Sequence, residues 1–149
     1  MQIYAKEIDN PKLLNPITLA FVGDAVYELL VRDMLALSGQ FPANRLHEQT
    51  VKYVCANAQA QAYDALVPML NEEELSVLKR GRNANNTKAP KNVNVGNYRK
   101  ATGIEALIGY LHLKGEHTRV QQLFCAICQA IGSEPALEQQ GQPDTLPDA

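Results

Sequence analysis

Apolar residues recur at helical spacing through the first part of the chain. Residues 16–36 keep this spacing without an internal proline, which predicts one long helix. Asn15 can cap its first turn, and Pro16 suits the position after the cap. Phe21 and Ala25 add apolar groups to a second face, so we expect this helix to be buried on nearly all sides. Its apolar stripe consists of Leu19, Val22, Val26, Leu29 and either Val31 or Met34.

Four more helices are predicted further along the chain. Their expected limits are residues 44–66, a start after Asn71, residues 98–113 and residues 118–131. The run Glu72-Glu73-Glu74 falls in the first turn of the third helix, where acids complement the positive end of the helix dipole. We therefore interpret this run as stabilising the helix rather than binding a metal. No stretch alternates at period two for long enough to form a strand, so the predicted fold class is all-α.

The composition indicates a single soluble domain. A chain of 149 residues can bury one core. No run approaches the roughly 20 apolar residues of a membrane helix, and the first twelve residues lack the pattern of a secretory leader. An odd number of cysteines without a leader favours reduced thiols and a cytoplasmic location. Cys125 and Cys128 lack further zinc ligands and are expected to be buried free thiols.

The net charge of −2 hides an uneven distribution. Residues 133–149 hold four acids and no Lys or Arg, and their Pro and Gln content predicts a disordered tail beside one domain at residues 1–132. Residues 79–100, the basic segment, hold seven of the 14 basic residues and no acid. Their Gly, Pro and Asn residues predict a loop, which either binds a polyanion or is simply solvated. The cations are Lys79, Arg80, Arg82, Lys88, Lys91, Arg99 and Lys100.

Two carboxylates fall within apolar helical stretches. Asp24 follows Gly23, and an ionised carboxylate buried there is unfavourable unless a cation or hydrogen-bond donors meet it. Glu105 is surrounded by small or apolar residues, and Gly103 and Gly109 leave room for a second helix to approach. The residues alone leave two interpretations open. Asp24 pairs with an arginine or caps a helix, or the two carboxylates form a site for a hard cation such as Mg²⁺.

The two stretches around these carboxylates resemble motifs of the ribonuclease III family. Phe21-Val22-Gly23-Asp24-Ala25-Val26 resembles its signature helix, and Glu105-Ala106-Leu107-Ile108-Gly109 resembles its second metal-binding helix. Residues 78–84 and 98–102 are similar to the Mini-ribonuclease III branch, which consists of the catalytic domain alone. The resemblance covers about residues 10–131 and implies the helical fold of the ribonuclease III catalytic domain.

The resemblance also implies an activity and partners. It implies a homodimer whose signature helices pack across a two-fold axis, with each active site cutting one strand of double-stranded RNA. Hydrolysis would depend on Mg²⁺ and leave 5′-phosphate and 3′-hydroxyl ends, with Asp24 and Glu105 as catalytic and metal-binding residues. The seven cations of the basic segment would contact the RNA. Precursor 23S ribosomal RNA, matured at both ends, is the expected substrate, and a ribosomal protein that shapes it is a further expected partner.

The chain departs from the family pattern at several acidic positions. Ile17 and Ala20 stand where the signature helix has glutamates, and Thr102 stands where the second motif has an aspartate. At the position of a further family carboxylate, this chain has only Ala43 or Asn44. The Thr102 hydroxyl could hold a water in place of the missing group. These departures keep open a non-catalytic relative that binds double-stranded RNA. An unrelated all-α metal hydrolase is disfavoured, because no set of Glu-x-x-Glu pairs is evident.

Overall fold

The computed structural model describes residues 10–84 and 89–132, which contain helices and no strand. The predicted all-α fold class is thus confirmed over these ranges, and none of their helices is long and apolar enough to cross a membrane. The tail at residues 133–149 and Lys88 lie outside the described residues. The α-helices are α1 (Pro16–Ser38), α2 (Leu46–Val54), α3 (Ala56–Leu66), α4 (Glu72–Asn83), α5 (Val95–Leu113) and α6 (His117–Gly132), with 3-10 turns η1 (Pro11–Leu13), η2 (Ala43–Arg45) and η3 (Val67–Met69).

The predicted starts of α1 and α4 are confirmed by their caps. The Asn15 side chain accepts a hydrogen bond from the Ile17 N–H at 2.8 Å, and Pro16 follows the cap. Asn71 accepts from the Glu74 N–H at 2.8 Å, while the Glu74 side chain accepts from the Asn71 N–H, which completes a capping box. Each cap satisfies N–H groups that the first turn of a helix leaves without a partner.

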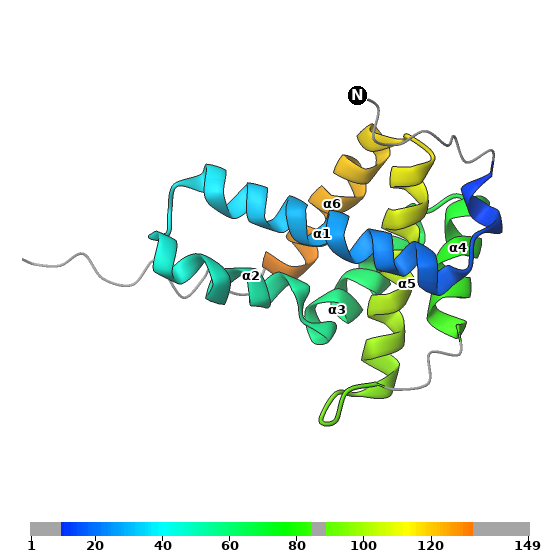
Figure 1. Ribbon diagram of the computed structural model, residues 1–149, viewed down its shortest axis with the longest axis horizontal. Helices are drawn as coiled ribbons and strands as arrows, with labels where there is room; N and C mark the ends of the chain where they lie inside the picture. Colours follow the sequence, from blue (N-terminus) through cyan, green and yellow to red (C-terminus); the bar gives the residue numbers. More distant parts are fainter. Residues whose placement is uncertain (1–9, 85–88, 133–149) are drawn as a thin grey trace, which may run out of the picture.

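Helix α5 lies at the centre of the fold, with α1 crossing it on one side and α4 packed on another (Figure 1). Glycines make both approaches possible. A Cβ added to Gly23 would lie 1.7 Å from the Glu105 carbonyl oxygen, and one added to Gly109 would lie 2.0 Å from the Leu19 carbonyl oxygen. On the α4 side, a Cβ on Gly103 would lie 2.8 Å from the backbone of Leu78. The close approach predicted from these glycines is confirmed.

The prediction of a single helix over residues 44–66 is wrong. The helix is interrupted at Cys55, whose extended backbone (φ −67°, ψ 153°) separates α2 from α3. Helix α2 packs on α1, whereas α3 turns inward against α5 and α6. Side chains from elsewhere satisfy the carbonyls at the break, because the Tyr27 hydroxyl donates to the Tyr53 carbonyl at 2.6 Å and the Gln59 amide donates to the Val54 carbonyl at 3.1 Å. Tertiary contacts thus override a continuous helical pattern.

The prediction that the basic segment is a loop is wrong at both of its ends. Helix α4 continues to Asn83, and α5 begins at Val95, where the Asn94 side chain accepts from the Asn97 N–H at 3.1 Å. Both ends of the segment are therefore helical, so their cations project from fixed turns of backbone. Figure 1 shows these ends leading out of α4 and into α5.

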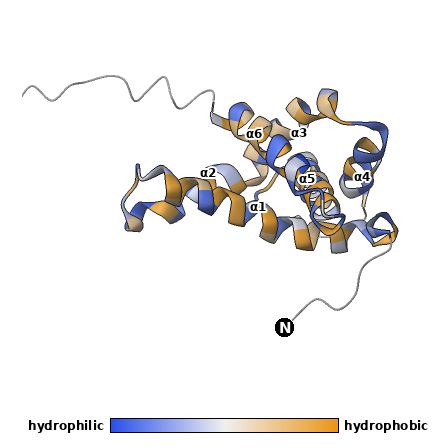
Figure 2. Cartoon of the chain, turned by 90° about the horizontal axis from the view of Figure 1, so that it is seen from above, coloured by the Kyte–Doolittle hydropathy of each residue, from blue (hydrophilic) through white to orange (hydrophobic). Residues whose placement is uncertain are grey.

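Helix α1 is not buried on all sides, contrary to the prediction. Phe21 is 80% exposed and Leu29 is 58% exposed, and Ala25 between them is exposed as well. Figure 2 shows α1 along one edge of the molecule, with hydrophobic colour over much of its length. Its neighbours α2, α4 and α5 cover only the face that carries Leu19, Tyr27 and similar core residues.

Candidate functional site

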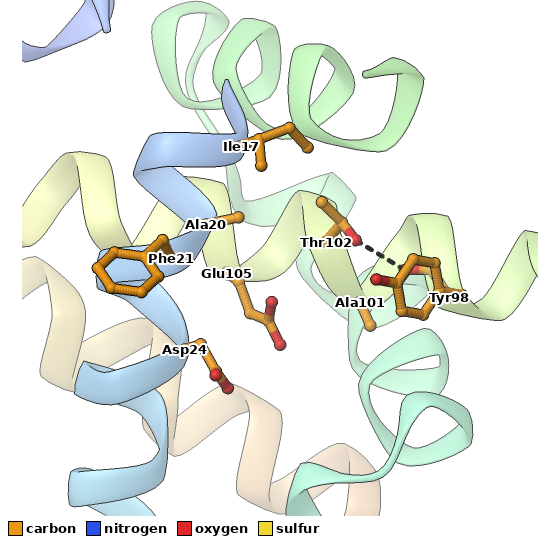
Figure 3. Close-up of a pocket in the computed structure, with 8 residues that line it drawn as sticks. All are labelled: Ile17, Ala20, Phe21, Asp24, Tyr98, Ala101, Thr102 and Glu105. Atoms are coloured by element: carbon orange, nitrogen blue, oxygen red, sulfur yellow. Dashed lines mark hydrogen bonds between the residues drawn. The ribbon is translucent and has the colours of Figure 1, made fainter. Parts of the chain in front are cut away.

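A pocket of about 230 Å³ opens between α1 and the first half of α5. Four residues come from each helix, and Figure 3 shows them around one space. The crossing of the two helices at Gly23 fixes their separation, so the pocket is set by backbone contacts rather than by mobile side chains. The lining residues are Ile17, Ala20, Phe21, Asp24, Tyr98, Ala101, Thr102 and Glu105.

Asp24 is exposed at this pocket, so the expectation that it is buried was wrong. The pattern had suggested burial because its sequence neighbours are apolar, but its side chain lies in the pocket between α1 and α5, where solvent reaches it. Among the described residues it makes no ion pair, so the arginine-paired interpretation finds no support. Partial burial raises the pKa of Asp24, and the nearby charge of Glu28 raises it further.

Glu105 was also predicted to be buried, and it is partly buried. Burial raises its pKa from the ordinary 4.5 to about 7, the negative charge of Asp24 adds to this rise, and a hydrogen bond from Gln59 opposes it. The Gln59 amide nitrogen lies 3.2 Å from Glu105 Oε1. Figure 3 shows both carboxylates, from α1 and from α5, directed into the same space. Their mutual repulsion would be relieved by a cation between them.

The remaining lining fits a small oxygen-ligand site. Ile17 and Ala20, which stand where the resembling signature helix has glutamates, line the pocket with apolar groups. The Thr102 hydroxyl donates to the Tyr98 carbonyl at 3.0 Å, which leaves its oxygen able to accept a hydrogen bond from a water. The described part of the chain holds no group of three or more His, Cys, Asp or Glu side chains that could hold a metal ion together. Two carboxylates with only oxygen donors fit Mg²⁺, which keeps several waters when bound to proteins.

Other acidic and thiol groups lie away from this pocket. Glu74 is only 4% exposed and receives two hydrogen bonds at 2.9 Å from the Arg119 guanidinium, so it serves the fold. The run Glu72-Glu73-Glu74 lies in the first turn of α4, as predicted. The expectation of buried thiols was wrong for Cys125, which is exposed, while Cys128 is partly buried and both are free. Ala43 and Asn44 lie outside the pocket lining.

The described cations of the basic segment differ in their surroundings. Lys79, Lys91 and Arg99 are exposed. Arg80 is committed to the fold, because its guanidinium donates to the Lys12 carbonyl at 2.8 Å and ties η1 to α4. Replacing Arg80 would remove this tertiary contact as well as a charge.

Arg82 and Lys100 both lie over the aromatic ring of Tyr63. The Arg82 guanidinium carbon lies 5.9 Å from the centre of the Tyr63 ring, and the Lys100 ammonium nitrogen lies 5.5 Å from it. Lys100 also pairs with Asp64 at 2.9 Å. Cation–π contacts of this kind fix the position of a charge without neutralising it. Tyr63 therefore orders cations at the end of α4 and the start of α5.

Two contributors were missed from the sequence, Gln59 and Tyr63. Both lie on the inner face of α3 with Ala62 and Leu66. Gln59 is 2% exposed and Tyr63 is 4% exposed. Gln59 could have been noticed because it falls at the helical spacing of the buried apolar residues of α3. A buried polar side chain needs a hydrogen-bond partner, so its position suggests a specific contact. The predicted continuous helix concealed that signal, because it misplaced the start of α3.

Comparison with known proteins agrees with the geometry of this pocket. The ribonuclease III domain family matches residues 17–116, which include both carboxylates. A Mini-ribonuclease 3 of Thermoanaerobacter sp. (strain X514) is 46% identical over 118 residues, covering 79% of this chain and 83% of the relative. A Mini-ribonuclease 3 of Brevibacillus brevis is 47% identical over 114 residues, covering 76% and 85%.

A solved structure shows the same fold. A crystal structure of a Fusobacterium nucleatum protein superimposes with a TM-score of 0.70 at 26% identity, covering 78% of this chain and 93% of that one. The family match spans the pocket, both helices that form it and most of the described core. The chain therefore belongs to the ribonuclease III domain family.

Proposed function

We propose that this protein is a Mg²⁺-dependent endoribonuclease that hydrolyses phosphodiester bonds of double-stranded RNA and leaves 5′-phosphate and 3′-hydroxyl ends. The observation that carries the proposal is the meeting of Asp24 and Glu105, from two different helices, at one pocket. Membership of the ribonuclease III domain family and the names of the Mini-ribonuclease 3 relatives support the ribonuclease activity.

Five of the eight side chains that line the pocket have a defined part in this proposal. Asp24 and Glu105 would hold Mg²⁺, which when bound supplies a Lewis acid that activates water and neutralises phosphate charge. Asp24 reaches solvent and is accessible to the RNA backbone, whereas Glu105 is held from behind by Gln59. Thr102 can accept a hydrogen bond from a water at the position of the missing family aspartate. Ile17 and Ala20 form an apolar wall that binds no further cation.

The exposed cations are proposed to bind the RNA backbone. A-form RNA offers proteins its phosphates and 2′-hydroxyls more readily than its base edges. Lys79, Lys91 and Arg99 are free of the tertiary contact that holds Arg80, so they are the better cations to neutralise. The substrate we propose is precursor 23S ribosomal RNA, matured at both ends in the cytoplasm with a ribosomal protein shaping the duplex. This choice rests on the sequence resemblance.

Neutralising the exposed cations tests the binding surface. We expect the triple variant Lys79→Gln, Lys91→Gln, Arg99→Gln to bind a duplex RNA more weakly. Each lost phosphate contact should also reduce the slope of log affinity against log salt by about 0.9. Lys52→Gln, an exposed lysine on α2, is the control for a general loss of charge. Binding curves across a salt series that match the wild type would show that the surface lies elsewhere.

The exposed apolar face of α1 is proposed to pack against a second copy of the chain. Phe21, Ala25 and Leu29 follow one another at intervals of four residues and are all exposed. An apolar stripe on one helix of a water-soluble protein is expected to be covered by a partner, and a two-fold axis would pair it with itself. Leu29→Asp should convert a dimer to a monomer in sedimentation analysis, whereas a wild-type monomer would contradict the proposal.

One cleavage experiment tests the catalytic proposal. A structured RNA duplex is incubated with the wild type, Asp24→Asn and Glu105→Gln, each with Mg²⁺ or with EDTA. We expect cleavage only by the wild type and only with Mg²⁺. Asp33→Asn removes an exposed carboxylate from the same helix and should cleave normally. Cleavage that survives Asp24→Asn would refute the assigned site.

A non-catalytic relative that binds double-stranded RNA is the second candidate. It is favoured by Ile17, Ala20 and Thr102, which replace three acidic positions of the family motifs. Wild-type protein that binds the duplex but leaves it intact with Mg²⁺ would support this candidate over the first.

A further inference from the structure

Gln59 is a buried polar residue directly behind the pocket. Only 2% of it is exposed, and it does not line the pocket. Its amide nitrogen donates two hydrogen bonds, one to the Val54 carbonyl at 3.1 Å and one to Glu105 Oε1 at 3.2 Å. One side chain of α3 thus links the end of α2 to the carboxylate on α5.

The break at Cys55 fixes the direction of this amide. Val54 is the last residue of α2, and the last carbonyls of a helix lack partners within it. The Gln59 backbone N–H donates to the Cys55 carbonyl at 3.1 Å, which places the residue in the first turn of α3. The Val54 carbonyl can only accept, and an ionised Glu105 can only accept as well. The NH₂ group of Gln59 must therefore face both of them.

The other end of the amide shows that the donors are what matters. Gln59 Oε1 is buried and has no hydrogen-bond partner among the described residues. A buried acceptor without a partner is unfavourable, so the amide oxygen does not account for a glutamine at this position. The arrangement keeps two donor bonds in spite of this unpaired oxygen. That is expected of a residue whose task is to hold an acceptor in place.

We propose that Gln59 is a positioning residue that holds the Glu105 carboxylate toward the pocket and so prepares it to bind the metal ion. The inference rests on the proposed function, because it takes Asp24 and Glu105 as the cation ligands. A neutral donor suits this role, since it orients a carboxylate without neutralising it. A lysine or arginine in its place would compete with the metal for Glu105. Groups that orient metal ligands in this way typically change metal affinity 10- to 100-fold when they are removed.

The test compares Gln59→Met with Gln61→Met. Methionine keeps the length of the side chain but has no donor, and Gln61 is exposed two residues further along the same helix. Binding of Mn²⁺, as a spectroscopic substitute for Mg²⁺, is measured by electron paramagnetic resonance on the full chain without RNA. Thermal unfolding in EDTA is measured in parallel. We expect Gln59→Met to raise the Kd for Mn²⁺ about 10- to 100-fold and Gln61→Met to leave it unchanged.

The possible outcomes distinguish a failure of the role of Gln59 from a failure of the proposed metal site. If Gln59→Met binds Mn²⁺ like the wild type while Glu105→Gln does not, the positioning role is overturned and the proposed site stands. A lower unfolding temperature with unchanged Mn²⁺ affinity would likewise assign Gln59 a structural role only and overturn the inference. If Glu105→Gln binds Mn²⁺ like the wild type, the proposed site fails and the inference fails with it.

A second variant covers the case in which Gln59→Met does not fold. Gln59→Asn keeps the amide but is one methylene shorter, so it cannot reach both Val54 and Glu105. We expect a weaker loss of Mn²⁺ affinity in the same direction. Wild-type affinity in Gln59→Asn would overturn the proposal.

Discussion

Replacing Glu105 with glutamine should make the metal-free protein more stable at alkaline pH. Burial and the neighbouring charge of Asp24 raise the pKa of Glu105 to about 7, above its ordinary 4.5. The folded protein therefore binds this proton more tightly than the unfolded chain does. The favourable contribution is complete below pH 4.5 and is lost as the pH rises through about 7. Above that pH the wild type carries an unfavourable buried charge that the glutamine variant lacks.

The size of the effect follows from this pKa change. A rise from 4.5 to about 7 corresponds to about 3 kcal/mol, at 1.36 kcal/mol for each pH unit. The pocket opens to solvent, which screens part of the repulsion, so we expect a gain of about 1 to 3 kcal/mol for Glu105→Gln at pH 8. Near pH 5 the carboxyl is mostly protonated, and the two proteins should differ little for this reason.

Urea unfolding in EDTA at pH 5 and pH 8 measures the effect. The informative quantity is the change in the stability difference between wild type and Glu105→Gln from one pH to the other, because packing differences cancel in it. The control is Asp33→Asn, which removes an exposed carboxylate from α1, and its stability difference from the wild type should be the same at both pH values. Mg²⁺ should stabilise the wild type at pH 8 and have little effect on Glu105→Gln. If the advantage of Glu105→Gln fails to grow between pH 5 and pH 8, the buried-charge explanation is refuted.

Two further predictions concern the stability of the fold. Gly109→Ala would place a Cβ 2.0 Å from the backbone of α1 and should lower the free energy of unfolding by about 3 kcal/mol or more. Gly132→Ala, where a Cβ meets nothing within 4 Å, is the control in the same urea titration. Arg119→Met leaves the buried Glu74 carboxylate without its partner and should lower stability by about 3 kcal/mol. Arg32→Met breaks only an exposed pair and should change it by less than about 1 kcal/mol. Equal effects of the two arginine variants would contradict the importance of burial.

The sequence by itself determined the features that depend on neighbouring residues. The starts of α1 and α4 were predicted from Asn15 and Asn71, because capping is a bond between residues two or three positions apart. The close approach of helices was predicted from Gly103 and Gly109, because only a residue without a Cβ leaves that space. Glu105 was predicted to be buried because the residues around it are small or apolar, and it is partly buried.

The tertiary structure alone decided what depends on which face of a helix is covered. Periodicity showed that α1 is apolar on two faces, but only the placement of its neighbours left Phe21 and Asp24 exposed. The break at Cys55 is stabilised by Tyr27, which lies 26 residues before the carbonyl it binds. Arg80 had the same local pattern as the exposed cations and was set apart by a contact with η1.

The pocket itself combines both kinds of information. Asp24 and Glu105 could be named from short motifs, because each motif is continuous in the chain. Gln59 could not, because its partner Glu105 lies 46 residues away and the bond exists only after α3 turns away from α2. The two carboxylates could therefore be identified from local sequence, whereas the side chain that contacts one of them could be identified only from the tertiary structure.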